Sequence, residues 1–228
     1  MRKHTEEMRP PRALFVPFEL GRPFGPPNYP ELQRQVLYDA LKLLERHKGP
    51  IIEDFISNLI NSNINEEIEE GWSCPVNLAS PIKDITDRQK LAMDLKQEVI
   101  LLQPWYQLSL KVTGGRRLDG LTHHSPEEII DLLINFLENP EIESFLLDQP
   151  IGRALKLTSD DLKHFYFQSA MARPKNISDG QLANWFYGET LAGKLLIEIR
   201  AICLAHQDKN LRLIGRTNFV PNAMLKYV

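Results

Sequence analysis

The pattern of hydrophobic and polar positions in the first 50 residues predicts a strand, a rigid loop and an amphipathic helix. Residues 13–18 form a short apolar run with β-branched and aromatic members, which is typical of a strand. Residues 19–28 are rich in Gly and Pro, which indicates an ordered loop. Asn28 and Glu31 form a helix-start pair, and Gly49-Pro50 ends the helix. One face of this helix carries apolar residues that predict a core contact: Leu32, Val36, Leu37, Ala40, Leu41 and Leu44.

The predicted strand at residues 13–18 has few candidate partners, because nearly all other patterns in the chain are helical. The backbone donors and acceptors of a strand need partners wherever water is excluded. We therefore expect this strand to pair with a minor strand elsewhere in the chain or with another chain.

The rest of the chain predicts helices that follow a polar connection. Residues 51–70 begin as a helix and turn into an acidic, Asn-rich segment. A break or kink is expected at Pro104, and short helices are expected from about residues 141 and 159. Capping boxes predict three helix starts, at Thr86 with Gln89, Ser125 with Glu128, and Ser178 with Gln181. The predicted fold class is mainly α: a strand-loop-helix region at 1–60, a connection at 61–83 and a helical bundle-like domain at 84–228.

A single long helix over residues 179–206 is the most regular pattern in the chain. Its apolar positions recur at steps of three and four residues, and Glu189 falls within this seam. Gly188 and Gly193 flank Glu189 and indicate close approach of another backbone. A carboxylate buried there needs a hydrogen-bond donor or must become protonated. The alternative is a Glu that reaches the rim of the seam.

Composition and charge exclude several classes of protein. With 43% apolar residues among 228, the chain can bury a sizeable core, and no run approaches the ~18 uninterrupted apolar residues of a spanning helix. The net charge of −3 comes from interspersed signs, which do not form the basic face that nucleic-acid binding needs. We expect a cytoplasmic protein with neither a membrane nor a nucleic-acid partner. Cys74 and Cys203 are interpreted as reduced thiols without redox chemistry.

A candidate site for a small anion lies around residues 114–128. Arg116 and Arg117 stand in a Gly-rich loop, and His123 and His124 directly precede a predicted helix start. Guanidinium, imidazole and helix-terminal groups all favour carboxylate or phosphate ligands. The loop lacks the spacing of a phosphate-binding P-loop, and the alternative is an exposed, solvated loop.

Asp161 and His164 place a carboxylate and an imidazole on one face of a predicted helix. A carboxylate-bridged di-iron site pairs two Glu-x-x-His motifs with two further Glu residues, whereas this chain has a single such pair. His164 is therefore a candidate binding residue, with a packing role as the alternative. The sequence indicates no metal site, no cofactor and no catalytic residue.

The strand-loop-helix region also carries a resemblance to a known family. VPFELGRPFGPP followed by VLYDALKLLE resembles the C-terminal tail of the large subunit of glycine, sarcosine, betaine and D-proline reductases, the selenoprotein B family. DLKHFYFQSA and WFYGETLAGKLLIEIR are similar to segments of bacterial proteins described only by their similarity to that family. The residues that match the tail are Pro17, Leu20, Gly21, Pro23, Ala40, Leu41 and Leu44.

This resemblance implies an accessory or remnant subunit of a reductase-like system. The cysteine or selenocysteine cluster of the family lies upstream of the tail, and only twelve residues precede Ala13, so no catalytic residue carries over. An oxidoreductase activity would then belong to the complex. The expected partner is another protein or a second copy, bound through residues 13–18 and the following loop. Two alternatives stay open: a stand-alone helical enzyme that binds a small anionic substrate, and a helical protein-interaction adaptor.

Overall fold

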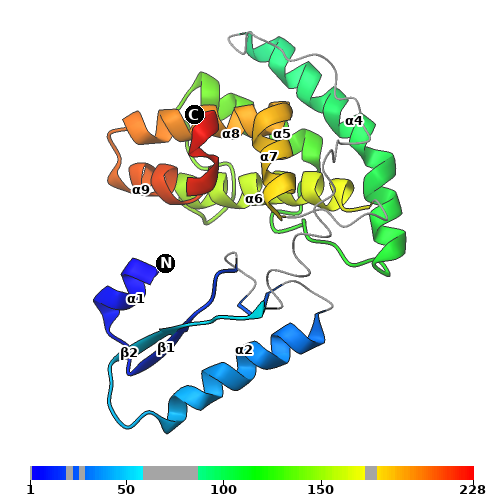
Figure 1. Ribbon diagram of the computed structural model, residues 1–228. Helices are drawn as coiled ribbons and strands as arrows, with labels where there is room; N and C mark the ends of the chain where they lie inside the picture. Colours follow the sequence, from blue (N-terminus) through cyan, green and yellow to red (C-terminus); the bar gives the residue numbers. More distant parts are fainter. Residues whose placement is uncertain (1, 19–22, 26–28, 59–86, 173–178) are drawn as a thin grey trace. The chain divides into compact units, whose positions relative to one another are not determined.

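The computed structural model describes residues 2–18, 23–25, 29–58, 87–172 and 179–228. The fold is mainly α, and the chain divides into two compact units, Met1–Glu70 and Gly71–Val228 (Figure 1). The division falls within the predicted connection at 61–83. That connection, which includes Cys74, lies outside the described residues, and so do Asn28, Thr86 and Ser178, which were expected at helix starts. Among the described helices, none is long and apolar enough to span a bilayer.

The N-terminal unit contains a parallel two-stranded sheet with a helix between its strands in sequence. In chain order its elements are α1 (Arg2–Met8), β1 (Arg12–Phe15), α2 (Pro30–Lys42), the short 3-10 helix η1 (Leu43–Glu45) and β2 (Ile51–Asp54). β1 pairs with β2 in a register that runs from Arg12 opposite Ile51 to Phe15 opposite Asp54. The predicted strand at residues 13–18 was expected to pair with a minor strand in the chain or with another chain, and the first alternative is confirmed for Ala13, Leu14 and Phe15.

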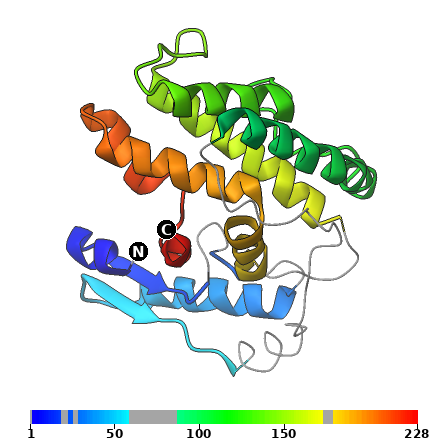
Figure 2. The same ribbon diagram turned by 90° about the horizontal axis from the view of Figure 1, so that it is seen from above.

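The prediction of a helix from residue 51 is wrong at its start. Ile51 and Ile52 are β-branched and suit an extended backbone, and their main-chain groups find partners in β1. Parallel strands need a long crossover, and α2 supplies it. Figures 1 and 2 show α2 running alongside the two strands.

Helix α2 buries only part of its apolar surface. Leu32 and Val36 pack with Phe55 in a small core. Leu37, Leu41 and Leu44 are exposed, although the sequence pattern placed them on the core face. The reason is the small size of the sheet, because two short strands cover a narrower stripe of helix than a full sheet does.

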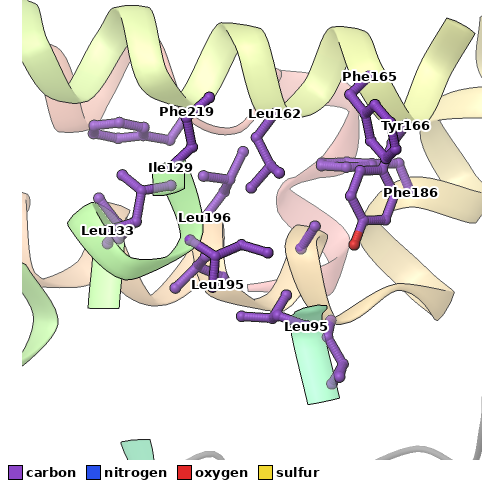
Figure 3. Close-up of a cluster of buried hydrophobic side chains, with 14 of the residues drawn as sticks. Leu95, Ile129, Leu133, Leu162, Phe165, Tyr166, Phe186, Leu195, Leu196 and Phe219 are labelled. Atoms are coloured by element: carbon purple, nitrogen blue, oxygen red, sulfur yellow. The ribbon is translucent and has the colours of Figure 1, made fainter. Parts of the chain in front are cut away.

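The C-terminal unit is a helical assembly around one apolar core. Helices α6 and α8 contact each other, and both contact α4, α5, α7 and α9, so these two helices lie at the centre of the unit. Figure 3 shows core side chains from α4 (Leu95), α5 (Ile129, Leu133), α6 (Leu162, Phe165, Tyr166), α7 (Phe186) and α8 (Leu195, Leu196) packed together. Its elements are α4 (Arg88–Val112), α5 (Pro126–Glu138), α6 (Ile151–Ala170), α7 (Asp179–Glu189), α8 (Leu191–Ala205), α9 (Lys209–Thr217) and the 3-10 helix η2 (Asn222–Tyr227).

Several predicted helix boundaries in this unit are wrong. Of the break or kink expected at Pro104, the break is wrong, because α4 continues through this residue. Helix α6 begins at Ile151 rather than near Ser159, and no helix forms at Glu141. The capping box of Ser125 and Glu128 is confirmed, since both of its hydrogen bonds are present.

The predicted long helix over residues 179–206 is interrupted at Thr190, which separates α7 from α8. The Thr190 hydroxyl accepts the N–H of Gly193 at 3.0 Å and donates to the carbonyl of Phe186 at 2.7 Å. This side chain therefore caps α8 and ties it to the last turn of α7. A Cβ atom on Gly193 would lie 2.0 Å from the Phe186 oxygen, so the predicted close backbone approach at Gly193 is confirmed.

Candidate functional site

The loop between α4 and α5 brings several of the predicted binding residues together. A hollow of about 450 Å³ is lined by Arg117, Asp119, Gly120, His123, His124 and Ser125. Three of these, Arg117, His123 and His124, are the candidates indicated by the sequence. We call this feature the loop hollow.

A buried carboxylate on α6 holds the loop in shape. Asp161 is almost fully buried and accepts the backbone N–H groups of Gly120, Leu121 and Thr122 at 2.8, 2.9 and 2.8 Å. It also accepts the Thr122 hydroxyl at 2.8 Å. These four donors satisfy the buried charge and fix three consecutive residues of the loop. Because these backbone N–H groups already donate to Asp161, a ligand in the hollow would have to bind to the surrounding side chains instead.

A buried amide on the same helix adds a second anchor for the loop. The Gln168 side chain donates to the Arg116 carbonyl at 2.8 Å and accepts the Leu118 N–H at 2.9 Å. Asp161 and Gln168 lie seven residues, or two helical turns, apart on α6. The loop is therefore fixed to α6 at two successive points.

Arg117 is oriented by a hydrogen-bonded chain that starts at Tyr106. The Tyr106 hydroxyl donates to Asp119 at 2.6 Å, and the Arg117 guanidinium donates to the same carboxylate at 2.9 Å. Burial and the bond to Asp119 raise the pKa of Tyr106 to about 12. Burial opposes ionisation of Asp119, but the bonds from Arg117 and Tyr106 outweigh it and lower the pKa of this carboxyl. Arg117 stays more than half exposed, so its charge faces the hollow in a defined direction.

The imidazoles stand at the start of α5. His123 is exposed and has a φ of 61°, a left-handed backbone that turns the chain toward Ser125. His124 Nδ1 lies 3.7 Å from Glu128 Oε2. The backbone N–H of Ser125 lowers the pKa of Glu128 and thereby favours its charged form. The hollow thus offers guanidinium and imidazole donors beside fixed carboxylates, an arrangement suited to a small polar ligand with one acidic group.

The other candidate residues lie elsewhere. Arg116 is exposed but does not line the hollow. His164 is half-buried on α6, and its Nδ1 atom is buried without a hydrogen-bond partner among the described residues. Asp161 uses both oxygens for the loop, which explains why it does not form a ligand pair with His164.

Glu189 is exposed at the C-terminal end of α7, so burial within the seam, one of the two alternatives for this residue, is wrong. The physical reason is the interruption at Thr190. That residue begins a new helix, so the side chains before it no longer follow the periodicity of those after it.

The buried carboxylate of the core is Glu98 on α4, which the sequence analysis did not single out. It accepts the Tyr166 hydroxyl at 2.9 Å and the N–H of Leu191, the first residue of α8, at 3.0 and 3.1 Å. Burial raises the pKa of Glu98 to about 7, although both hydrogen bonds favour the charged form. Its position three residues after Leu95 and four before Leu102 was the available signal, because that spacing places it on the apolar face of α4.

Cys203 is fully buried on α8, as predicted, and burial raises the pKa of its thiol to about 12. A thiol with this protonation and burial is a poor nucleophile. In the described ranges, no group of three or more His, Cys, Asp or Glu side chains is arranged to hold a metal ion.

Comparison with known proteins adds no relative. No protein family model, curated protein or solved structure matches this chain.

Proposed function

We propose that this protein is a cytoplasmic accessory subunit of a reductase-like assembly, which binds a partner subunit and contributes no thiol or selenol chemistry itself. The proposal starts from the resemblance of the strand, loop and helix that follow Ala13 to the tail of the reductase large subunit. In support, β1 and α2 fold together within one compact unit. The deep burial of Cys203 also fits a chain in which this thiol takes no part in the chemistry.

The observation that carries the proposal is the open outer edge of β1. The carbonyl groups of Pro11 and Phe15 accept N–H groups from Ile51 and Phe55 of the β2 segment at 3.3 and 2.8 Å. Main-chain groups of successive strand residues point in opposite directions, so those of Arg12 and Leu14 point away from β2. Within the described part of the chain, the sheet has no third strand to receive them.

The two edges of the sheet differ in charge. On β2, Glu53 and Asp54 pair with Arg46 and Arg2, and charged side chains on an edge strand discourage pairing with another chain. On β1, the residues that follow Arg12 are apolar. The β1 edge is therefore the side on which a partner strand is expected to add.

The test uses two substitutions at Leu14. Leu14→Pro removes the outward N–H and leaves the ladder N–H groups in place, whereas Leu14→Ala removes the side chain but keeps the N–H. The tagged full-length protein is cross-linked in its native host, and the captured chains are identified by mass spectrometry. We expect capture of a subunit with a redox-active thiol or selenol by the parent and Leu14→Ala proteins, and its loss with Leu14→Pro. Equal capture by all three, or a captured set without such a subunit, contradicts the proposal.

A second candidate function is binding of a small anion in the loop hollow, as in a stand-alone helical enzyme. It is favoured by the convergence of Arg117, His123 and His124 around one hollow on a loop that Asp161 holds in shape. Arg117 is the strongest contributor, because its guanidinium is fixed by Asp119 and can meet an acidic group with parallel N–H bonds.

The matched test of this second function compares Arg117→Gln with Arg116→Gln. Arg116 is adjacent and exposed but does not line the hollow. Inorganic phosphate and oxalate are titrated into each protein while the ring-proton NMR signals of His123 and His124 are followed. We expect saturable shifts in the parent and Arg116→Gln proteins, and at least about tenfold weaker binding in Arg117→Gln, since a charged hydrogen bond contributes about 1.5–3 kcal/mol. The absence of saturable shifts in the parent protein removes this function.

A further inference from the structure

The first N–H group of helix α8 is bound by a side chain from another helix. The first N–H groups of any helix lack an acceptor within that helix. Both carboxylate oxygens of Glu98, on α4, accept the Leu191 N–H, at 3.0 and 3.1 Å. The same carboxylate accepts the Tyr166 hydroxyl of α6 at 2.9 Å. Glu98 therefore joins α4 and α6 to the start of α8.

The Glu98 carboxylate is buried among neutral donors. Only 4% of this residue is exposed, and it forms no ion pair with any residue that the structure describes. The Leu191 and Ala192 N–H groups and the Tyr166 hydroxyl favour its charged form, as does the charge of Lys194 on α8. Burial opposes all of them, has the largest influence, and raises the pKa of Glu98 to about 7.

The other charged groups of the surrounding helices do not balance a charge on Glu98. Two cations of α4 are already paired with carboxylates of neighbouring helices: Lys96 with Asp131 of α5, and Arg88 with Glu198 of α8. Asp94, one turn before Glu98, and Glu189, at the end of α7, are further acidic groups. Loss of the Glu98 proton therefore leaves a buried negative charge without a paired cation among the described residues.

We infer that Glu98 is a pH-sensitive latch, whose neutral form holds the start of α8 against α4 and whose charged form favours a local opening that lets water reach the carboxylate. In the opened state the carboxyl regains its ordinary pKa of 4.5, whereas in the closed state the pKa is about 7. The closed state is thus favoured fully below pH 4.5. As the pH rises through 7, the equilibrium constant for opening increases by up to about 300-fold, the factor that corresponds to the difference between 4.5 and 7. This latch lies in the C-terminal unit and stands apart from the proposed function.

The first test measures amide exchange at Leu191 in the full-length protein between pH 4.5 and 8, corrected for the intrinsic exchange rate at each pH. The protection of Leu191 is expected to fall by up to about 300-fold over this range in the parent protein. Glu98→Gln should remove this dependence on pH, because Gln keeps the shape and can accept the N–H without titrating. Glu189→Gln is the matched control, since it changes an exposed carboxyl at the same junction, and it should behave like the parent.

Low concentrations of urea separate a local opening from global unfolding. A local opening exposes little surface, so exchange at Leu191 should hardly change with urea. Exchange at Leu133, in the core of the same unit, should depend strongly on urea. Equal urea dependence at the two residues overturns the latch, as does a dependence on pH that Glu98→Gln retains.

The second test follows the carboxyl carbon of Glu98 by NMR during a pH titration of the folded parent protein, so it does not depend on the folding of any variant. The midpoint is expected near pH 7. Tyr166→Phe removes a donor to the charged form and is expected to move the midpoint higher. A midpoint near 4.5 in the parent protein contradicts the inference.

Discussion

Two buried carboxylates, Glu98 and Asp161, each join segments of the C-terminal unit that are far apart in sequence. Glu98 on α4 accepts hydrogen bonds from α6 and from the start of α8, and Asp161 on α6 accepts four from the loop before α5. Their surroundings differ in the number of donors. Asp161 accepts hydrogen bonds from four donors, whereas Glu98 accepts them from fewer, and burial raises the pKa of Glu98.

Substitution of Glu98 by Gln is expected to change how stability depends on pH. A carboxyl with a pKa of about 7 in the folded protein and 4.5 when unfolded binds more protons when folded between these values. Below pH 4.5 the carboxyl is protonated in both states, and the free energy of unfolding is not reduced by its burial. As the pH rises from 4.5 through 7, the free energy of unfolding falls by up to about 3 kcal/mol. Glu98→Gln removes this loss, so its free energy of unfolding relative to the parent should rise between pH 4.5 and 8.

Urea unfolding at several pH values measures this difference. Glu189→Gln is the matched control, because Glu189 is exposed. An unchanged difference between the parent and Glu98→Gln across this pH range would show that Glu98 does not titrate in the folded protein.

Substitution of Asp161 by Asn is expected to loosen the loop around the hollow. In Asn an NH₂ group replaces one carboxylate oxygen and faces donors that had bonded to that oxygen. Two or more hydrogen bonds are therefore lost. The expected cost is about 2–4 kcal/mol in the free energy of unfolding. Amide exchange at Gly120, Leu121 and Thr122 should become faster. Asp131→Asn, an exposed member of an ion pair with Lys96, is expected to change neither quantity measurably.

At the scale of elements, the junction between α7 and α8 determines the path of the chain through the core. Thr190 caps the second helix, and Gly193 lets that helix approach the Phe186 carbonyl of the first. Leu191, the first residue of α8, also donates to Glu98. One short segment thus combines a helix cap, a close backbone approach and the core carboxylate.

Gly193→Ala is expected to be among the most damaging single substitutions in this chain. Its Cβ would lie 2.0 Å from the Phe186 oxygen, and backbone cannot move aside as a flexible side chain can. We expect a loss of at least about 3 kcal/mol in the free energy of unfolding, measured by urea titration. The neighbouring Lys194→Ala should cost far less, and equal effects of the two substitutions would contradict the close approach.

Some boundaries of helices and strands could be predicted from the sequence, and others could not. Ser125 with Glu128 located the start of α5, because a capping box is a local pattern whose donors and acceptors lie within one turn. The interruption at Thr190 was missed, since the apolar periodicity continues on both sides and only tertiary packing separates the helices. The same limit applies to Ile51, whose extended backbone depends on a partner strand far away in the sequence.

For the candidate site, the sequence identified side chains but not their support. Arg117, His123 and His124 were found because they cluster within one loop. Asp161 was considered beside His164, its neighbour on the helix, whereas its partners are loop amides about 40 residues away in sequence. Contacts of this kind follow from the fold and leave no local pattern.

At the scale of the whole molecule, the two units differ in how much apolar surface they bury. The C-terminal unit encloses a large apolar cluster, whereas the described residues of the N-terminal unit form a small cluster of Leu32, Val36 and Phe55 with partly buried neighbours. The smaller unit also holds the outer edge of β1 and three exposed apolar residues of α2, Leu37, Tyr38 and Leu41. This division fits the proposed subunit, which would fold through the larger unit and bind its partner through the smaller one.

Amide hydrogen exchange tests the role of the β1 edge most directly. The full-length protein is measured alone and after cross-link-guided isolation of the complex with its captured partner. We predict that the Leu14 amide, which points away from β2, gains strong protection in the complex, while Gly120, Leu121 and Thr122 stay as protected as before. Unchanged exchange at Leu14, with protection appearing elsewhere in the chain, would contradict binding through this edge.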